Sequence, residues 1–115
     1  MSRAEFQLET PKKDGDDGSV PAEVTVTGEV DASNVVEFTR SVRELSGARP
    51  TILQLSNIKY LDSAGFSALD RLLADDEIVI VLAPNSFMYR VAELMCMPIH
   101  HDAKAARKAL QKGAR

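Results

Sequence analysis

Alternation of apolar and polar residues marks the clearest β-strand of the chain, at residues 22–30. Glutamate and threonine occupy one face, and the apolar positions of the other face are Val24, Val26 and Val30. This period of two is typical of a half-buried strand. A shorter alternation around Phe6 and Leu8 predicts an earlier strand that pairs with it. Residues 11–21 between them are dominated by glycine, proline and aspartate, which predicts a mobile loop.

Helical spacing of apolar residues replaces this alternation after residue 30. The apolar stripe of the predicted first helix comprises Val35, Phe38, Val42 and Leu45. Either Asp31 or Ser33 is expected to cap the start of this helix, because both side chains can accept a hydrogen bond from a free backbone N–H. Gly47, followed by Pro50, is expected to end it.

A strand, a loop and a second helix are predicted next. Residues 51–56 predict the strand, and residues 57–60 predict the loop. The segment 61–65 then opens a helix whose apolar stripe is formed by Phe66, Leu69, Leu72 and Leu73. This helix is expected to end in a tight turn at residues 75–76.

An uninterrupted apolar run at residues 78–83 predicts a strand of the kind that usually lies centrally in a sheet, covered on both faces. A third helix is predicted between a cap at Asn85 or Ser86 and a stop at Pro98, and its apolar positions are Phe87, Val91 and Leu94. The core beneath this helix, or alternatively a soft rim for a partner, is expected to hold Met88, Met95, Cys96 and Met97.

A last short helix is predicted at residues 103–112, capped by Asp102. Strands that alternate with helices favour parallel pairing through right-handed crossovers, with an antiparallel hairpin at the amino-terminal edge. We therefore expect an α/β fold in which a mixed, mostly parallel sheet of about four to five strands packs with about four helices. No internal repeat is visible, and residues 1–115 are expected to form a single domain.

Composition limits the functions that this fold can carry. The 115 residues are 44% hydrophobic with a net charge of −3, so a buried core is expected and nucleic-acid binding is not. One cysteine, Cys96, excludes an internal disulfide, and no zinc-type spacing or phosphate-binding glycine loop occurs. We therefore expect no metal and no cofactor. Without a signal peptide or a bilayer-length apolar run, we expect a cytoplasmic protein without membrane insertion.

The segment Asp62-Ser63-Ala64-Gly65 is the strongest candidate for chemistry. A hydroxyl in the first turn of a helix is exposed, and a phosphate on it would lie beside unpaired N–H groups and the positive end of the helix dipole. Gly65 is expected to leave room for another chain to approach. The alternative is that Asp62 is simply an N-cap and Ser63 a tolerated polar residue, which the local pattern taken alone favours.

Three segments together resemble the STAS domain of bacterial anti-sigma factor antagonists. They are Thr27-Gly28-Glu29-Val30-Asp31, Ile52-Leu53-Gln54-Leu55 and Tyr60-Leu61-Asp62-Ser63-Ala64-Gly65-Phe66. The similarity extends from about residue 22 to residue 110. Many members of the family carry a second serine after the acceptor, where this chain has Ala64.

The resemblance implies a partner switch. In the family, the serine after the aspartate is phosphorylated by an anti-sigma factor that is itself a serine kinase, which implies Ser63 as the acceptor. The unphosphorylated protein would bind this kinase and free the sigma factor, phosphorylation would release the kinase, and a serine phosphatase would reset the switch. This chain would be a substrate and not an enzyme. The implied partner-binding residues are Asp31, Asp62, Ser63, Ala64, Gly65 and Phe66.

Alternative functions follow from the same residues. A STAS module that does not switch would act as a scaffold in a lipid or anion transport complex. A phosphorelay receiver is disfavoured because its acceptor aspartate would directly end a strand, whereas a loop is predicted before Asp62. A hydrolase is disfavoured because the segment around Ser67 lacks the second glycine of a nucleophile elbow. His100 and His101 are adjacent and lack nearby ligands for a metal site.

Overall fold

A computed structural model of the chain describes residues 4–10, 21–47 and 49–113, with side chains as far as residue 110. Residues 11–20 of the predicted loop lie outside these described residues. The helices and strands, in chain order, are β1 Phe6–Glu9, β2 Ala22–Val30, α1 Val35–Ser46, β3 Thr51–Gln54, β4 Ile58–Leu61, α2 Ser63–Asp75, β5 Ile78–Val81, α3 Tyr89–Leu94 and α4 Ala103–Gly113.

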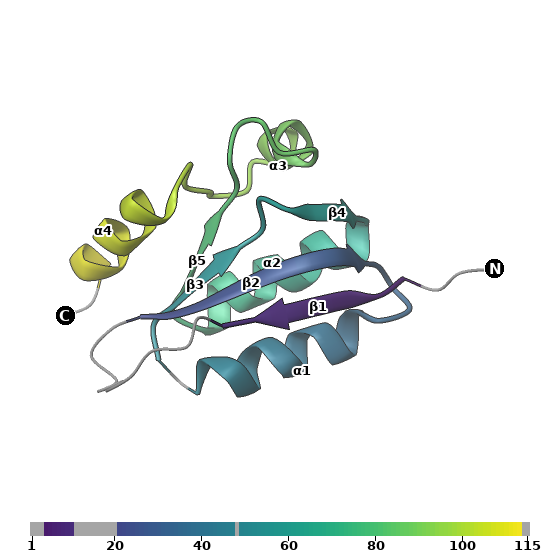
Figure 1. Cartoon of the computed structure of the whole chain (residues 1–115), viewed down its shortest axis with the longest axis horizontal. Helices are drawn as coiled ribbons and strands as arrows, with labels where there is room; N and C mark the ends of the chain where they lie inside the picture. Colours follow the sequence, from purple (N-terminus) through teal and green to yellow (C-terminus); the bar gives the residue numbers. More distant parts are fainter. Residues whose placement is uncertain (1–3, 11–20, 48, 114–115) are drawn as a thin grey trace.

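The five strands form one mixed sheet in the order β1-β2-β3-β5, with β4 paired to β2 beside this path (Figure 1). Strand β1 is antiparallel to β2, and the other pairings are parallel. The long strand β2 pairs with β3 through its first half and with β4 through its last three residues, with a bulge between Gly28 and Glu29. The predicted α/β fold, with its mixed sheet and four helices, is confirmed.

Alternation along the strands sends side chains into two separate cores. On β3 and β5, Leu53 and Ile80 join the main core, which α1 and α2 cover. Their neighbours Ile52 and Val81 point to the opposite face and pack against Ala106 and Leu110 of α4. An ion pair of 2.8 Å between Arg107 Nη2 of α4 and Glu23 Oε2 of β2 also joins this helix to the sheet. Helices therefore cover both faces of the sheet centre, α1 and α2 on one side and α4 on the other. The position of α2 is fixed by its packing on this sheet.

Strand β4 was predicted as a loop, and this prediction is wrong. Its four residues have buried ends, Ile58 and Leu61, around the exposed pair Lys59 and Tyr60. Because its buried apolar residues are three positions apart, the segment shows no alternation in the sequence. It forms because its backbone pairs with the end of β2, which β3 leaves free.

Strand β5 was predicted to be central, but β3 is its one partner among the described strands. Its residues are nevertheless mostly buried, because helices cover both of its faces. The outer edge of β5 is closed by His100, whose backbone N–H donates to Ile80 O and whose carbonyl accepts from Leu82 N–H. The apolar run at residues 78–83 therefore indicates burial on both faces of the strand, and it does not indicate a central position in the sheet.

The start of α1 differs from the prediction. The N-cap is Asn34, without a side-chain capping bond, and neither Asp31 nor Ser33 caps the helix. Its fully buried positions are Phe38, Val42 and Ser46, whereas Leu45 is exposed. The end is as predicted, with Gly47 in the left-handed conformation (φ 58°). The caps of the other long helices also agree, since Asp62 begins α2 and the Asp102 side chain accepts from Ala105 N–H at 2.8 Å.

Helix α3 and the residues next to it bury a different face from the predicted one. Met88 and Ala92 point into the main core together with Met97. The predicted apolar face is exposed, with Phe87 at 76% and Leu94 at 75%. Met95 and Cys96 are also exposed, so the expectation that this group fills the core holds for Met88 and Met97 alone.

Candidate functional site

The Ser63 hydroxyl lies in the first turn of α2, where strand β4 delivers the chain to one edge of the sheet. Ser63 is exposed. The preceding Asp62 has the extended backbone of an N-cap residue (φ −95°, ψ −172°). Within the described residues, the backbone N–H groups of Ser63 and Ala64 have no hydrogen-bond partner. An anion on the Ser63 hydroxyl would therefore lie beside two unpaired donors and the positive end of the helix dipole.

The Asp62 carboxylate joins the two predicted motifs. Its Oδ1 accepts from Gly65 N–H at 2.9 Å, which caps α2, and its Oδ2 accepts from Ala32 N–H at 3.3 Å in the loop after β2. The Asp62 N–H donates to Val30 O at 3.3 Å. Asp31, between Val30 and Ala32, thus lies at the same edge of the sheet as the Ser63 turn. The structure brings these predicted site residues together.

Two other predicted partner residues face inward. Phe66 is 3% exposed and belongs to the main core. Gly65 is buried, and a Cβ placed on it would lie 3.0 Å from Leu61 Cδ2 and 3.1 Å from Val30 O. The glycine therefore allows α2 to approach the end of β2, and the expectation that it leaves room for another chain is wrong. Asp31, Asp62, Ser63 and Ala64 remain accessible, and their contact with a partner stays a prediction.

The loop between β2 and α1 is shaped by its own side chains. Asp31 Oδ1 accepts from Ser33 Oγ at 2.6 Å and from Ser33 N–H at 2.8 Å. These bonds, led by that of the hydroxyl, lower the pKa of the Asp31 carboxyl below its ordinary value of 3.8. Asn34 accepts from Asp31 N–H and donates to the carbonyls of Ala4 and Glu29. Sequence reasoning missed Asn34, although aspartate, serine and asparagine close together are typical of such turns.

A groove of about 640 Å³ between α1 and α2 was also missed. Its walls carry apolar and small side chains at the amino-terminal ends of both helices and arginines further along. The lining residues are Val35, Val36, Thr39, Arg40, Arg43, Glu44, Ala64, Ser67, Ala68 and Arg71. Ala64 directly follows Ser63, so the groove begins at the candidate acceptor. No sequence signal pointed to it, because it depends on how far apart the two helices lie.

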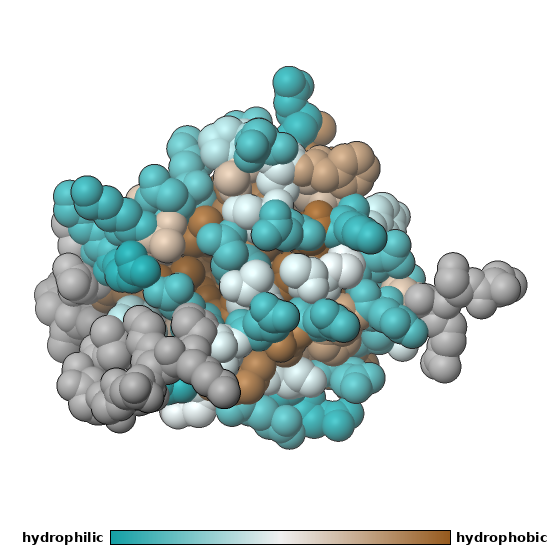
Figure 2. Space-filling view, viewed as in Figure 1, coloured by the Kyte–Doolittle hydropathy of each residue, from teal (hydrophilic) through white to brown (hydrophobic). Residues whose placement is uncertain are grey.

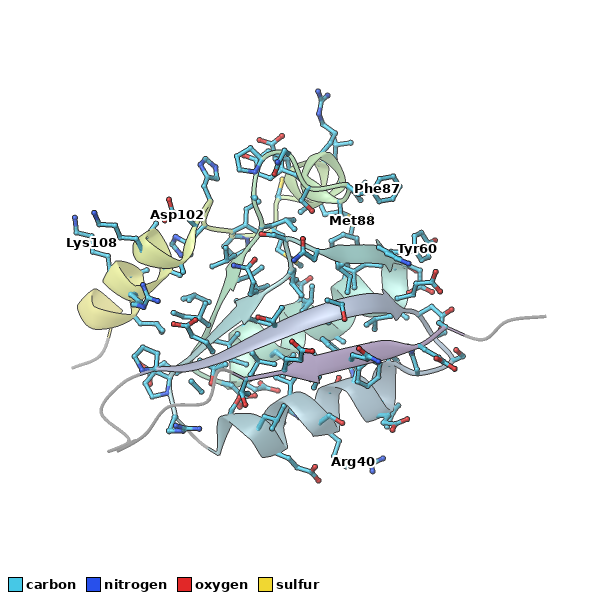
Figure 3. The ribbon with its side chains drawn as sticks, in the orientation of Figure 1. Arg40, Tyr60, Phe87, Met88, Asp102 and Lys108 are labelled. Atoms are coloured by element: carbon cyan, nitrogen blue, oxygen red, sulfur yellow. The ribbon has the colours of Figure 1, made fainter. Side chains whose placement is uncertain are left out.

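Exposed apolar side chains on and next to α3, and one on β4, are a second accessible feature. They are Tyr60, Phe87, Val91, Leu94 and Met95. Phe87 and Tyr60 project toward the same side of the molecule (Figure 3). In the space-filling view, a small pale brown area lies near the position of Phe87, next to hydrophilic residues (Figure 2).

The segment that carries this site matches a known protein family. The sequence model of the STAS domain matches residues 8–85, which is well over half of the chain. The chain belongs to the STAS domain family. The resemblance predicted from the sequence is thereby confirmed, and the matched residues of this STAS domain include the whole Ser63 turn and both helices of the groove.

One relative of this STAS domain is a mycobacterial protein. A stretch of 47 residues is 43% identical to osmosensory protein A of Mycobacterium tuberculosis. The match covers 40% of this chain and 30% of that protein, so the chain spans under a third of its relative.

Solved structures share the fold at low sequence identity. An anti-sigma factor antagonist from Mycobacterium paratuberculosis is 16% identical with a TM-score of 0.68, over 93% of this chain and 95% of that one. The anti-sigma factor antagonist SpoIIAA in its unphosphorylated form is 20% identical with a TM-score of 0.50, over 96% and 100%. A protein with a SpoIIAA-like fold from Shewanella loihica is 10% identical with a TM-score of 0.53, over 96% and 97%. These likenesses establish the fold.

Membrane-spanning helices and clustered metal ligands are both absent from the described part of the chain. Within residues 4–10, 21–47 and 49–113, no helix combines the length and the apolar character needed to cross a bilayer. Among the same residues, no three or more histidine, cysteine, aspartate or glutamate side chains are grouped as metal ligands would be.

Proposed function

We propose that this STAS domain is an anti-sigma factor antagonist that switches partners through phosphorylation of Ser63. The observation that carries the proposal is the accessible Ser63 hydroxyl in the first turn of α2, next to the Asp62 carboxylate that organises the turn. Membership of the STAS family and the likeness to two anti-sigma factor antagonists support it. The protein is the substrate of a serine kinase, and it is not itself an enzyme.

The switch acts through charge. Unphosphorylated, the surface around Ser63 binds the anti-sigma factor, and the sigma factor is free to act in transcription. Phosphorylation adds roughly 1.5 to 2 negative charges at pH 7 beside Asp62 and close to Asp31. The resulting like-charge repulsion and the cost of burying the phosphate weaken the complex. A serine phosphatase restores the binding form.

The proposed setting is the cytoplasm, where a kinase has access to ATP and to the sigma factor. The similarity to osmosensory protein A makes an osmotic stimulus a reasonable first condition to test. No cofactor, metal, nucleic acid or membrane insertion is part of the proposed mechanism. In the scaffold alternative, a transport protein would be the partner, and Ser63 would carry no phosphate.

Incubation with the partner kinase and MgATP tests the proposal. We expect one phosphate per chain in the wild type and none in Ser63→Ala, with binding of the unphosphorylated partner retained. Ser41→Ala is the matched control, because Ser41 is a partly exposed helical serine that does not line the groove. Undiminished phosphate incorporation in Ser63→Ala would reject Ser63 as the acceptor.

A further inference from the structure

The lining of the groove between α1 and α2 changes from apolar at one end to basic at the other. Both helices follow parallel strands, so their amino termini lie at the same end. That end is apolar, lined by Val35, Val36 and Ala64, and Val36 is 73% exposed. From Val35 to Arg43 the groove runs about 12 Å along α1, at about 1.5 Å per residue, which is roughly two helical turns.

The far part of the groove is rich in arginine. Arg40 and Arg43 come from α1 and Arg71 from α2, against a single acidic lining residue, Glu44. Arg43 is held by Asp76 at 2.9 Å and by Asp75 at 3.4 Å, at the carboxyl-terminal end of α2. Within the described residues, Arg40 and Arg71 have no ion-pair partner, and Figure 3 shows Arg40 projecting away from the body of the domain. The groove is therefore locally basic on a chain whose net charge is −3.

We propose that this groove docks an amphipathic helix, bearing carboxylates, of the partner protein that acts on Ser63. A groove two turns long that is apolar at one end and basic at the other suits an amphipathic helix with contact positions at i, i+3 or i+4, and i+7. Arg40 and Arg71 each present a planar guanidinium that binds a carboxylate through two hydrogen bonds. The proposal rests on the proposed function, because it names the contact that the Ser63 partner makes.

Docking here links the groove to the phosphorylation site. Ala64 lines the groove and directly follows Ser63, so a bound helix ends beside the acceptor hydroxyl. A phosphate on Ser63 then lies beside the apolar end of the bound helix, and the cost of burying its charge there adds to the repulsion from Asp62. The groove therefore supplies both the affinity of the unphosphorylated complex and part of its sensitivity to the phosphate.

Site-specific photocrosslinking in native cells tests the docking directly. The photoreactive residue p-benzoylphenylalanine replaces Val36 in the groove or, as the matched control, the equally exposed Phe87 outside it. We expect Val36→p-benzoylphenylalanine to crosslink to a protein segment with apolar residues at helical spacing and several aspartates or glutamates, identified by mass spectrometry. Crosslinking from the Phe87 position alone, from neither position, or to a segment without acidic residues would overturn the proposal.

A synthetic peptide with the sequence of the captured segment then measures the role of the arginines. The double variant Arg40→Glu, Arg71→Glu is expected to weaken peptide binding at least tenfold. Lys104→Glu, Lys108→Glu on α4 changes net charge equally, away from the groove, and is expected to leave binding within twofold of the wild type. Equal losses in both double variants would contradict the proposal. Mass spectrometry of Ser63 from the same cells separates the two ideas, since crosslinking without any Ser63 phosphate would reject the switch and keep the groove.

Discussion

Replacement of Asp62 by alanine tests whether one carboxylate organises both halves of the Ser63 site. The change removes the cap on Gly65 N–H and the bond to Ala32 N–H. Loss of an N-cap typically costs about 1 kcal/mol, and loss of a further partly exposed hydrogen bond costs about 0.5 kcal/mol. We therefore expect the free energy of unfolding to fall by about 1–2 kcal/mol, and the melting temperature to fall by about 4 °C for each kcal/mol in a domain of this size.

Urea unfolding followed by circular dichroism measures this change, with an unchanged dependence on urea expected because the surface exposed on unfolding stays the same. Asp62→Asn is the informative second variant. Its side-chain oxygen can still cap Gly65, whereas its amide group cannot accept from Ala32, so we expect a smaller loss. Asp102→Ala is the matched control, because it removes the cap of α4 and leaves the Ser63 turn intact. A loss of stability for Asp62→Ala below about 0.3 kcal/mol would refute the reasoning.

Three further predictions concern other contacts of the fold. Gly28→Ala should lower the free energy of unfolding, measured in urea titrations, by about 2–4 kcal/mol. The backbone of Gly28 is left-handed (φ 93°), and the Glu5 carbonyl occupies the place that a Cβ would take. A loss below about 1 kcal/mol would contradict this prediction. In NMR titrations, Ser33→Ala should raise the pKa of Asp31 toward 3.8. The native bonds to Asp31 stabilise the fold above that pH and cease to do so as the pH falls through the lowered pKa of the folded state. An unchanged titration midpoint of Asp31 would refute their role. Arg43→Gln should lower the urea midpoint at low salt but not at about 1 M salt, because salt screens the ion pairs with Asp75 and Asp76. Arg40→Gln should leave the midpoint unchanged at both salt concentrations. Equal effects of the two substitutions would show that the ion pairs of Arg43 contribute nothing to stability.

Local sequence patterns predict a helix or strand correctly where one of its faces is apolar over several residues. The alternation in β2 and the stripe of α2 each identify a single buried face, and both are confirmed. The Asp62 cap was predicted for the same reason, because capping depends on residues within one turn. These elements position Ser63, so its place at a helix start could be predicted from the sequence alone.

Features that depend on neighbours were missed. In α3, two apolar faces compete, and the sequence does not show that the smaller pair Met88 and Ala92 enters the core while Phe87 and Leu94 stay outside. The pairing of β4 exists because β3 leaves the end of β2 free. Gly65 was expected to admit another chain, whereas the space beside it holds Val30 O and Leu61. Each miss concerns tertiary contact, which spacing along one segment cannot encode.

Mass spectrometry of this protein from its native cells tests the central claim most directly. The peptide that carries Ser63 is expected to occur with and without one phosphate. The phosphorylated form should be absent from the population that co-purifies with the partner. A Ser63 peptide that is found only without phosphate, or a phosphate located on another residue, would contradict the switch.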